Sequence, residues 1–261
     1  MKMKLFQVDA FTSRLFGGNP AAVCILNEWP ADSLMQQIAA ENNLSETVFT
    51  VPSEGGYEIR WFTPLVEVEL CGHATLAAAH VLFEHYDHPA DLIRFFSREM
   101  GTLSVMRSEG LLTLDFPADR LEVIEISEEL SEALGQTPVM AFRGRTDYML
   151  VYPDQKDIEA IAPDFVRLAK TGKRGVIVTA RGRDVDFVSR FFAPGVGISE
   201  DPVTGSAHTT LTPYWSGELE KKRLTARQLS ERGGDLVCED HGDRVHISGR
   251  AVTYLEGEID V

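Results

Sequence analysis

Two segments of the sequence begin expected helices at a glycine, and each could bind an anion. LCGHATLAAAHVLF (70–83) begins its helix at Gly72 and His73, and the helix after SEDPVTGSA (199–207) begins at Gly205 and Ser206. A helix N-terminus carries unpaired N–H groups and a partial positive charge. Two such termini facing one cleft would hold a carboxylate without a lysine or arginine. Glycine lets the backbone approach a ligand closely, although both glycines could simply begin tightly packed helices.

The SEDPVTGSA segment adds a run of polar side chains before the second helix. Asp201 precedes a proline that fixes a turn, and Thr204 and Ser206 supply hydroxyl groups. A helix N-cap needs only one such residue. A longer run favours a ligand-binding surface, while capping remains open for Asp201 and Thr204.

A glutamate in the segment NNLSETVFTV (42–51) is the candidate for proton transfer. Glu46 lies between Leu44 and Val48, where a helix is expected to give way to a strand. Apolar surroundings raise the pKa of a carboxyl group, because desolvation disfavours its charged form. A carboxyl group whose pKa approaches neutrality could take up and return a proton. An exposed glutamate in a loop is the alternative.

The two glycine-started helices belong to an internal repeat. YEIRWFTP (57–64) matches FVSRFFAP (187–194), and Gly72 corresponds to Gly205. Half a chain is too long a unit for a solenoid, so the repeat predicts two similar fused domains. The place of Glu46 in the second half falls near Gly175, so the acid is present in one half only.

Short alternating apolar runs predict many strands in each half, and helices are expected at 31–42 and 73–86. The second of these helices has almost no charge, which predicts burial on every side. We therefore expect an α/β (α+β) fold in which a curved sheet or barrel wraps around a central helix in each domain. The expected domains are residues 1–118 and 119–261, where the last strand could cross back to the first domain.

Composition limits the partners that the protein can bind. The chain of 261 residues has 44% hydrophobic and 25% charged residues and a formal net charge of −15. This charge argues against nucleic acid and anionic membranes as partners, but a locally positive pocket could hold a small anion. No apolar run approaches the ~20 residues of a membrane span, and the start MKMKLFQVDAF resembles a strand rather than a signal peptide.

Cysteine and histidine spacing predicts no metal and no cofactor. Cys24, Cys71 and Cys238 are odd in number and widely spaced, which indicates a reducing cytoplasm. No HExxH or paired CxxC pattern is present, and no GxGxxG motif follows a strand. His80, His85 and His88 are interpreted as solvated residues near a helix end.

The chain as a whole resembles the phenazine-biosynthesis PhzF-like family, within the diaminopimelate-epimerase-like fold. The resemblance runs from residue 8 to the C-terminus through the segments VDAFTSRLFGGNPAAV, LSETVF, RWFTPLVEVELCGHATLAAAHVLF, FFAPGVGISEDPVTGSAHTTLTPYW and GDRVHISGRAVTYLEGEI. It implies two similar α/β domains with an active site in the cleft between them, no cofactor and a homodimer. The family's best-known member is an isomerase of dihydro-hydroxyanthranilate.

The family's site residues correspond to Glu46, His73, Asp201 and Ser206 of this sequence. The resemblance implies that Glu46 moves a proton from one carbon to another. His73 and Asp201 are the other expected catalytic residues. A small anionic metabolite is the expected substrate, and its binding residues are expected to be Gly72, His73, Asp201, Thr204, Gly205 and Ser206.

Two other functions remain open from the sequence. A cofactor-independent amino-acid racemase or epimerase of this fold would use one thiol per domain, and Cys71 fits only the first place. A non-catalytic metabolite-binding protein could keep the same residues without turnover. Deuterium from solvent appearing in recovered substrate would separate an enzyme from a binding protein.

Overall fold

The computed structural model describes residues 2–261, and the chain divides into two compact units. Unit 1 comprises the residues up to Asp115 together with Ser248–Val261, and unit 2 comprises Phe116–Ile247. Within the described residues, no helix is both long and apolar enough to cross a membrane.

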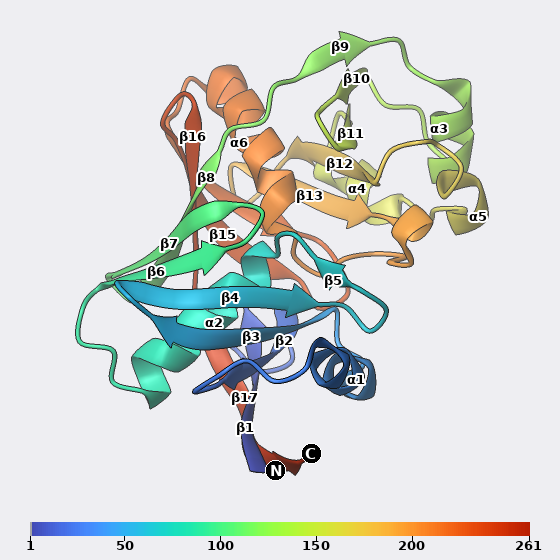
Figure 1. Cartoon of the computed structure of the whole chain (residues 1–261). Helices are drawn as coiled ribbons and strands as arrows, with labels where there is room; N and C mark the ends of the chain where they lie inside the picture. The colour runs from blue at the N-terminus through green and yellow to red at the C-terminus, as the bar shows by residue number, and fades with distance from the viewer. Residues whose placement is uncertain (1) are drawn as a thin grey trace. The chain divides into compact units, whose positions relative to one another are not determined.

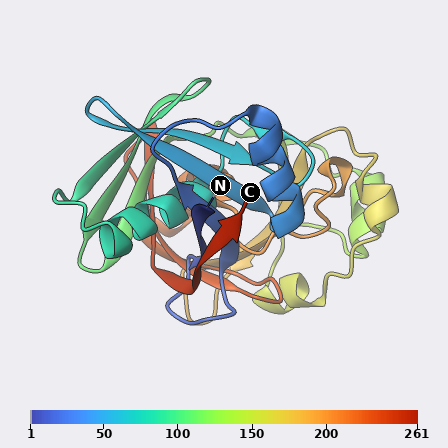
Figure 2. The ribbon, with the colours of Figure 1, turned by 60° about the horizontal axis from the view of Figure 1, so that its bottom comes forward.

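Unit 1 is a mixed sheet with two helices. Its strands are β1 (Lys2–Ala10), β2 (Asn19–Ile25), β3 (Glu46–Ser53), β4 (Gly56–Phe62), β5 (Glu67–Val68), β6 (Leu92–Ser97), β7 (Gly101–Ser108), β8 (Leu111–Pro117) and β17 (Ala251–Asp260). The helices are α1 (Asp32–Asn42) and α2 (Gly72–His85). The first and last strands, β1 and β17, pair antiparallel, so the two ends of the chain lie side by side (Figure 2).

Helix α2 is the buried centre of unit 1 (Figure 1). It contacts β1, β2, β3, β7 and β17. Ten of its 14 residues are buried, from His73 to Phe83. Alanines dominate the middle of the helix, and their small side chains let strands pack against it on several sides. The nearly uncharged sequence of this helix follows from that position.

Unit 2 has strands of the same mixed kind and shorter helices. Its strands are β9 (Glu122–Ile124), β10 (Met140–Arg143), β11 (Asp147–Val151), β12 (Gly175–Arg181), β13 (Phe187–Phe192), β14 (Arg223–Gln228), β15 (Gly234–Asp240) and β16 (Arg244–Gly249). Its helices are α3 (Glu128–Leu134), α4 (Gln155–Ala160), α5 (Phe165–Leu168), the 3₁₀ turn η1 (Pro194–Val196) and α6 (Gly205–Leu219).

The strand pairings repeat between the units. In unit 1 the pairs β1–β2, β2–β3, β3–β4, β4–β6 and β6–β7 are antiparallel, parallel, antiparallel, parallel and antiparallel. In unit 2 the pairs β10–β11, β11–β12, β12–β13, β13–β14 and β14–β15 follow the same series. The internal repeat of the sequence is therefore a repeat of topology.

Helix α6 accommodates a proline in its interior. Pro213 has no N–H to donate to the carbonyl of Thr209, four residues earlier. The backbone N–H of Asp119 donates to that carbonyl instead, at 3.1 Å. The Asp119 carboxylate also accepts from the Thr210 hydroxyl at 3.0 Å. The segment before β9 is thereby fixed to the helix within unit 2.

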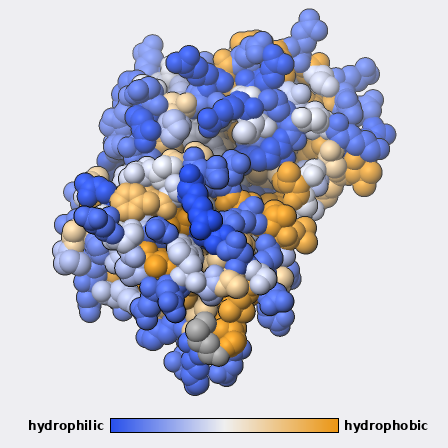
Figure 3. Space-filling view, viewed as in Figure 1, coloured by the Kyte–Doolittle hydropathy of each residue, from blue (hydrophilic) through white to orange (hydrophobic). Residues whose placement is uncertain are grey.

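The surface of the protein is mainly hydrophilic on the face drawn in Figure 3. Apolar residues (orange) form separate patches among the hydrophilic residues (blue). Two exposed aromatic residues of unit 1, Phe16 and Tyr254, make an edge-on contact with ring centroids 5.7 Å apart.

Candidate active site

The carboxyl group of Glu46 lies against the imidazole of His73. Glu46 is the first residue of β3, paired in register with Ala21 of the parallel strand β2. His73 is the second residue of α2. Glu46 Oε2 is 3.3 Å from His73 Nε2, and the two side chains are 12% and 6% exposed. Strand β3 and helix α2 thus bring together an acid and an imidazole that are 27 residues apart in the sequence.

Burial keeps the imidazole of His73 uncharged. Desolvation lowers the pKa of its imidazole to about 3, and a hydrogen bond to the backbone of Pro20 opposes this only in part. The ring therefore carries no charge at neutral pH. Glu46 therefore faces an uncharged imidazole across this contact.

Asn19, the first residue of β2, fixes the other side of the imidazole. Asn19 Nδ2 is 3.2 Å from His73 Nδ1. Asn19 and the Pro20 backbone thus hold the ring in place beside Glu46. Sequence analysis did not select Asn19, although it lies in the GGNP segment that carries the family resemblance.

Cys71 belongs to the same cluster. It occupies the N-cap position of α2, is 7% exposed, and its Sγ is 3.4 Å from His73 Nδ1. Glu46, Cys71 and His73 offer one ligand atom each within 4.8 Å of one another, a donor set that a divalent metal could use. The spacing of these three residues matches neither the HExxH motif nor a paired CxxC motif.

The predicted residues of unit 2 form a second hydrogen-bonded group. The Thr204 hydroxyl donates to Asp201 Oδ2 at 2.5 Å, so it does not cap α6. Gln228, at the end of β14, accepts from the Thr204 N–H at 2.9 Å and donates to the Asp201 carbonyl at 2.7 Å. Gln228 is fully buried and was not selected from the sequence.

Ser206 is paired with an arginine that sequence analysis also did not select. Arg174 Nη2 donates to Ser206 Oγ at 3.0 Å. The Asp147 carboxylate holds the same guanidinium with contacts of 2.9 and 2.5 Å. Arg174 lies directly before Gly175, the place that corresponds to Glu46. The beginning of α6 thus has a fixed guanidinium, paired with Asp147, beside the Ser206 hydroxyl.

The structure explains why only one half of the repeat carries an acid. A Cβ atom at Gly175 would lie 2.3 Å from Cζ of Phe191, far inside van der Waals contact. The Phe191 ring therefore occupies the space that a side chain would need. Unit 1 places Glu46 at the corresponding position, so a carboxyl group at this position is confined to unit 1.

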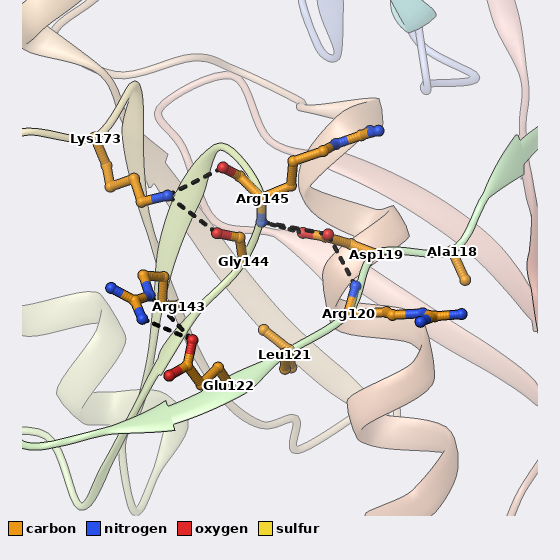
Figure 4. A pocket seen from close by; sticks show the side chains of 9 residues that line it. All are labelled: Ala118, Asp119, Arg120, Leu121, Glu122, Arg143, Gly144, Arg145 and Lys173. Atoms are coloured by element: carbon orange, nitrogen blue, oxygen red, sulfur yellow. Dashed lines mark hydrogen bonds and ion pairs between the residues drawn. The ribbon is translucent and has the colours of Figure 1, made fainter.

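A pocket of about 500 Å³ lies elsewhere in unit 2 (Figure 4). It is lined by residues 118–122, 143–145 and 173, none of which was predicted as a site residue. Two of its ionic side chains have partners: Arg143 pairs with Glu122 at 2.7 Å, and Lys173 donates to the carbonyls of Gly144 and Arg145. We assign no proton-transfer role to this pocket.

The histidines at the end of α2 are not simply solvated. His80 and His85 both lie within 3.0 Å of the Thr253 hydroxyl on β17. Burial lowers the pKa of His80 to about 4. The expectation of solvated side chains is corrected for these two residues, because β17 packs against the helix.

Two units with the same series of strand pairings define a fold of the diaminopimelate-epimerase-like class. A hydroxyproline epimerase from Agrobacterium vitis shares this fold, with a TM-score of 0.60, 12% identity and coverage of 99% of this chain and 92% of that chain. The chain belongs to the phenazine biosynthesis-like protein family, whose PhzC-PhzF model matches residues 8–257. The fold and family expected from the sequence are confirmed.

Two relatives match along their whole length. A Pseudomonas aeruginosa protein named an uncharacterized isomerase is 55% identical over 260 residues, which cover 99% of each chain. The crystal structure of a PhzF-family phenazine biosynthesis protein from Enterococcus faecalis has a TM-score of 0.97 and 46% identity, and each chain is covered completely.

Proposed function

We propose that the protein is an isomerase that moves a proton between two carbons of a small carboxylate-bearing metabolite. The contact between Glu46 and the neutral imidazole of His73 is the observation that carries this proposal. The names of close relatives support the reaction class, since several are called isomerases.

In this reaction Glu46 acts first as a base and then as an acid. Its carboxylate removes a proton from a carbon next to a substrate double bond, and the electron pair of that C–H bond moves into conjugation. The neutral carboxyl group then returns the proton to a second carbon, so no electron acceptor is needed. His73, held by Asn19, orients Glu46 through the 3.3 Å contact between Nε2 and Oε2.

The residues at the beginning of α6 are proposed to bind the substrate. Ser206 and Arg174 offer a hydroxyl and a guanidinium to a carboxylate. Asp201 keeps Thr204 in place and is a candidate partner for an amine or hydroxyl of the substrate. Gly72 and Gly205 begin the two helices, whose N-terminal N–H groups are proposed to bind the carboxylate.

An epimerase that uses Cys71 is the second candidate. Cys71 lies in the same cluster as Glu46 and His73, and its Sγ is 3.4 Å from His73 Nδ1. The corresponding N-cap residue of α6 is Thr204, which offers no thiol. A two-thiol mechanism therefore lacks its second base in this chain.

Proton exchange with solvent tests the proposal. The wild-type protein is incubated in D₂O with a panel of unsaturated cyclic amino acids, including dihydro-hydroxyanthranilate, and with saturated α-amino acids. We expect deuterium, detected by NMR, at a ring carbon of an unsaturated compound. Deuterium only at the α-carbon of saturated amino acids would favour the epimerase, and no exchange with any compound would favour a binding protein.

The variant Glu46→Gln separates chemistry from binding. The amide has a similar shape but cannot carry the proton, so exchange should fall by ~10²–10⁴. Circular dichroism and the melting temperature should show that the variant folds. A rate within tenfold of wild type would remove Glu46 from the mechanism.

A further inference from the structure

Two histidines and a glutamate gather on one hairpin of unit 2 and belong to neither group described above. Glu239 lies near the end of β15, His241 lies in the turn, and His246 lies on β16. The backbone N–H of His241 donates to the backbone carbonyl of Arg244 at 2.9 Å and closes the hairpin. Two residues further along each strand, Glu239 comes opposite His246. Side chains two apart on one strand share a face, so all three lie on the same face.

The distances within this hairpin cluster suit a metal ion. His241 Nε2 is 3.4 Å from Glu239 Oε2, and the two imidazole rings have centroids 4.2 Å apart. One ligand atom from each residue lies within 4.8 Å of the others. Ligand bonds of ~2.0–2.2 Å in a tetrahedral site place ligand atoms roughly 3.3–3.6 Å apart. The 3.4 Å between His241 Nε2 and Glu239 Oε2 already falls in this range, and rotation of the His246 side chain would have to bring its ligand atom as close.

We propose that Glu239, His241 and His246 form a binding site for Zn²⁺ or a similar divalent transition metal, with water as the fourth ligand. Imidazole and carboxylate are ligands that zinc accepts readily. His241 is 46% and Glu239 29% exposed at the side chain, so an ion and a water can reach the cluster. The spacing of these residues matches no metal-binding motif, because the third ligand comes from the opposite strand.

The charges around the cluster leave one carboxylate oxygen for the metal. Arg223 Nη1 pairs with Glu239 Oε1 at 2.7 Å and orients the carboxylate. The other oxygen, Oε2, is the one proposed to bind the metal. Oε2 faces the His241 ring. An ion bound here would connect β15, the turn and β16, and would therefore stabilise the hairpin. The site is independent of the proton-transfer proposal.

Isothermal titration of zinc chloride into the chelator-stripped full chain tests the site. We expect one ion per chain at this cluster. His241→Gln and His246→Gln should each weaken zinc binding roughly tenfold or more. Removing a residue that only hydrogen-bonds to a metal ligand commonly lowers the affinity ~10-fold or more, so removing a ligand itself should cost at least as much. His88→Gln, a histidine of unit 1, is the matched control and should bind like wild type. Melting curves without zinc should show that all variants fold.

A second measurement locates the ion. Because Glu46, Cys71 and His73 also offer ligand atoms, zinc titration is repeated with Cys71→Ala. Cobalt(II) should shift and broaden the ring resonances of His241 and His246 in the NMR spectrum of wild type and of Cys71→Ala. Unchanged affinity in both His241→Gln and His246→Gln, binding abolished by Cys71→Ala alone, or no zinc binding by the wild type would overturn the proposal.

Discussion

At the scale of single residues, the role of Cys71 separates the two reaction classes. Its thiol lies 3.4 Å from the imidazole that also contacts Glu46, so geometry alone permits either group to handle a proton. If Cys71 only packs at the beginning of α2, Cys71→Ala should keep turnover within about tenfold. If Cys71 is a catalytic base, the same variant should lower the reaction rate by a factor of ~10² or more. A folded but inactive Cys71→Ala variant would indicate that the thiol acts as a catalytic base.

Buried histidines make a second prediction at this scale. Desolvation lowers the pKa of His73 to about 3 and that of His208 to about 4, from an ordinary value of 6.5. Below pH 6.5 the unfolded chain takes up protons that the folded protein does not, so the folded state loses stability as the pH falls toward 4. The melting temperature should decrease over this range.

His208→Gln tests this linkage, because His208 lies outside the proposed proton-transfer pair. Its Nδ1 is 2.8 Å from the Thr204 carbonyl and its ring packs near Phe187. The variant is expected to show a shallower decrease of melting temperature between pH 6.5 and 4. A slope equal to that of wild type would mean that His208 does not contribute. His88→Gln serves as the control for a partly exposed histidine.

At the scale of elements, the packing of β12 against β13 decides why the second half of the repeat has no acid. Gly175→Ala places a methyl group against the Phe191 ring and should lower the free energy of unfolding by about 1–3 kcal/mol. Gly217→Ala in α6 is the matched control, because a Cβ there meets no atom within 4 Å. It should stabilise the helix by up to about 1 kcal/mol. Urea unfolding measures both, and equal effects would contradict the packing argument.

At the scale of the whole molecule, the family resemblance predicts a homodimer that forms through sheet surfaces away from the proposed active site. Sedimentation equilibrium at micromolar concentration should then give twice the chain mass of 29.0 kDa. Phe16 and Tyr254 are exposed apolar residues of unit 1 and candidates for such an interface. A single species of chain mass across the concentration range would exclude the dimer, and Phe16→Asp should leave such a monomer unchanged.

Much of the fold could be predicted from the sequence because its signals are local. Alternating apolar runs predict strands, and the uncharged stretch of α2 predicts a central helix, which is buried as expected. The segments of the family resemblance run through the chain in order, so they identified the fold class and the family without knowledge of any contact. Residue types at the helix starts and this resemblance together point to Glu46, His73, Asp201 and Ser206, whose roles in catalysis and binding remain predictions.

The partners of these residues were decided only by the tertiary structure. Asn19 reaches His73 because β2 and α2 pack together, and Gln228 reaches Thr204 from the end of β14. Arg174 and Asp147 meet at Ser206 through the parallel pairing of β11 and β12. Likewise, Glu239 and His246 come together because β15 and β16 form a hairpin. No periodicity carries such information, because contacts between distant residues depend on strand register and packing, which the whole chain determines at once.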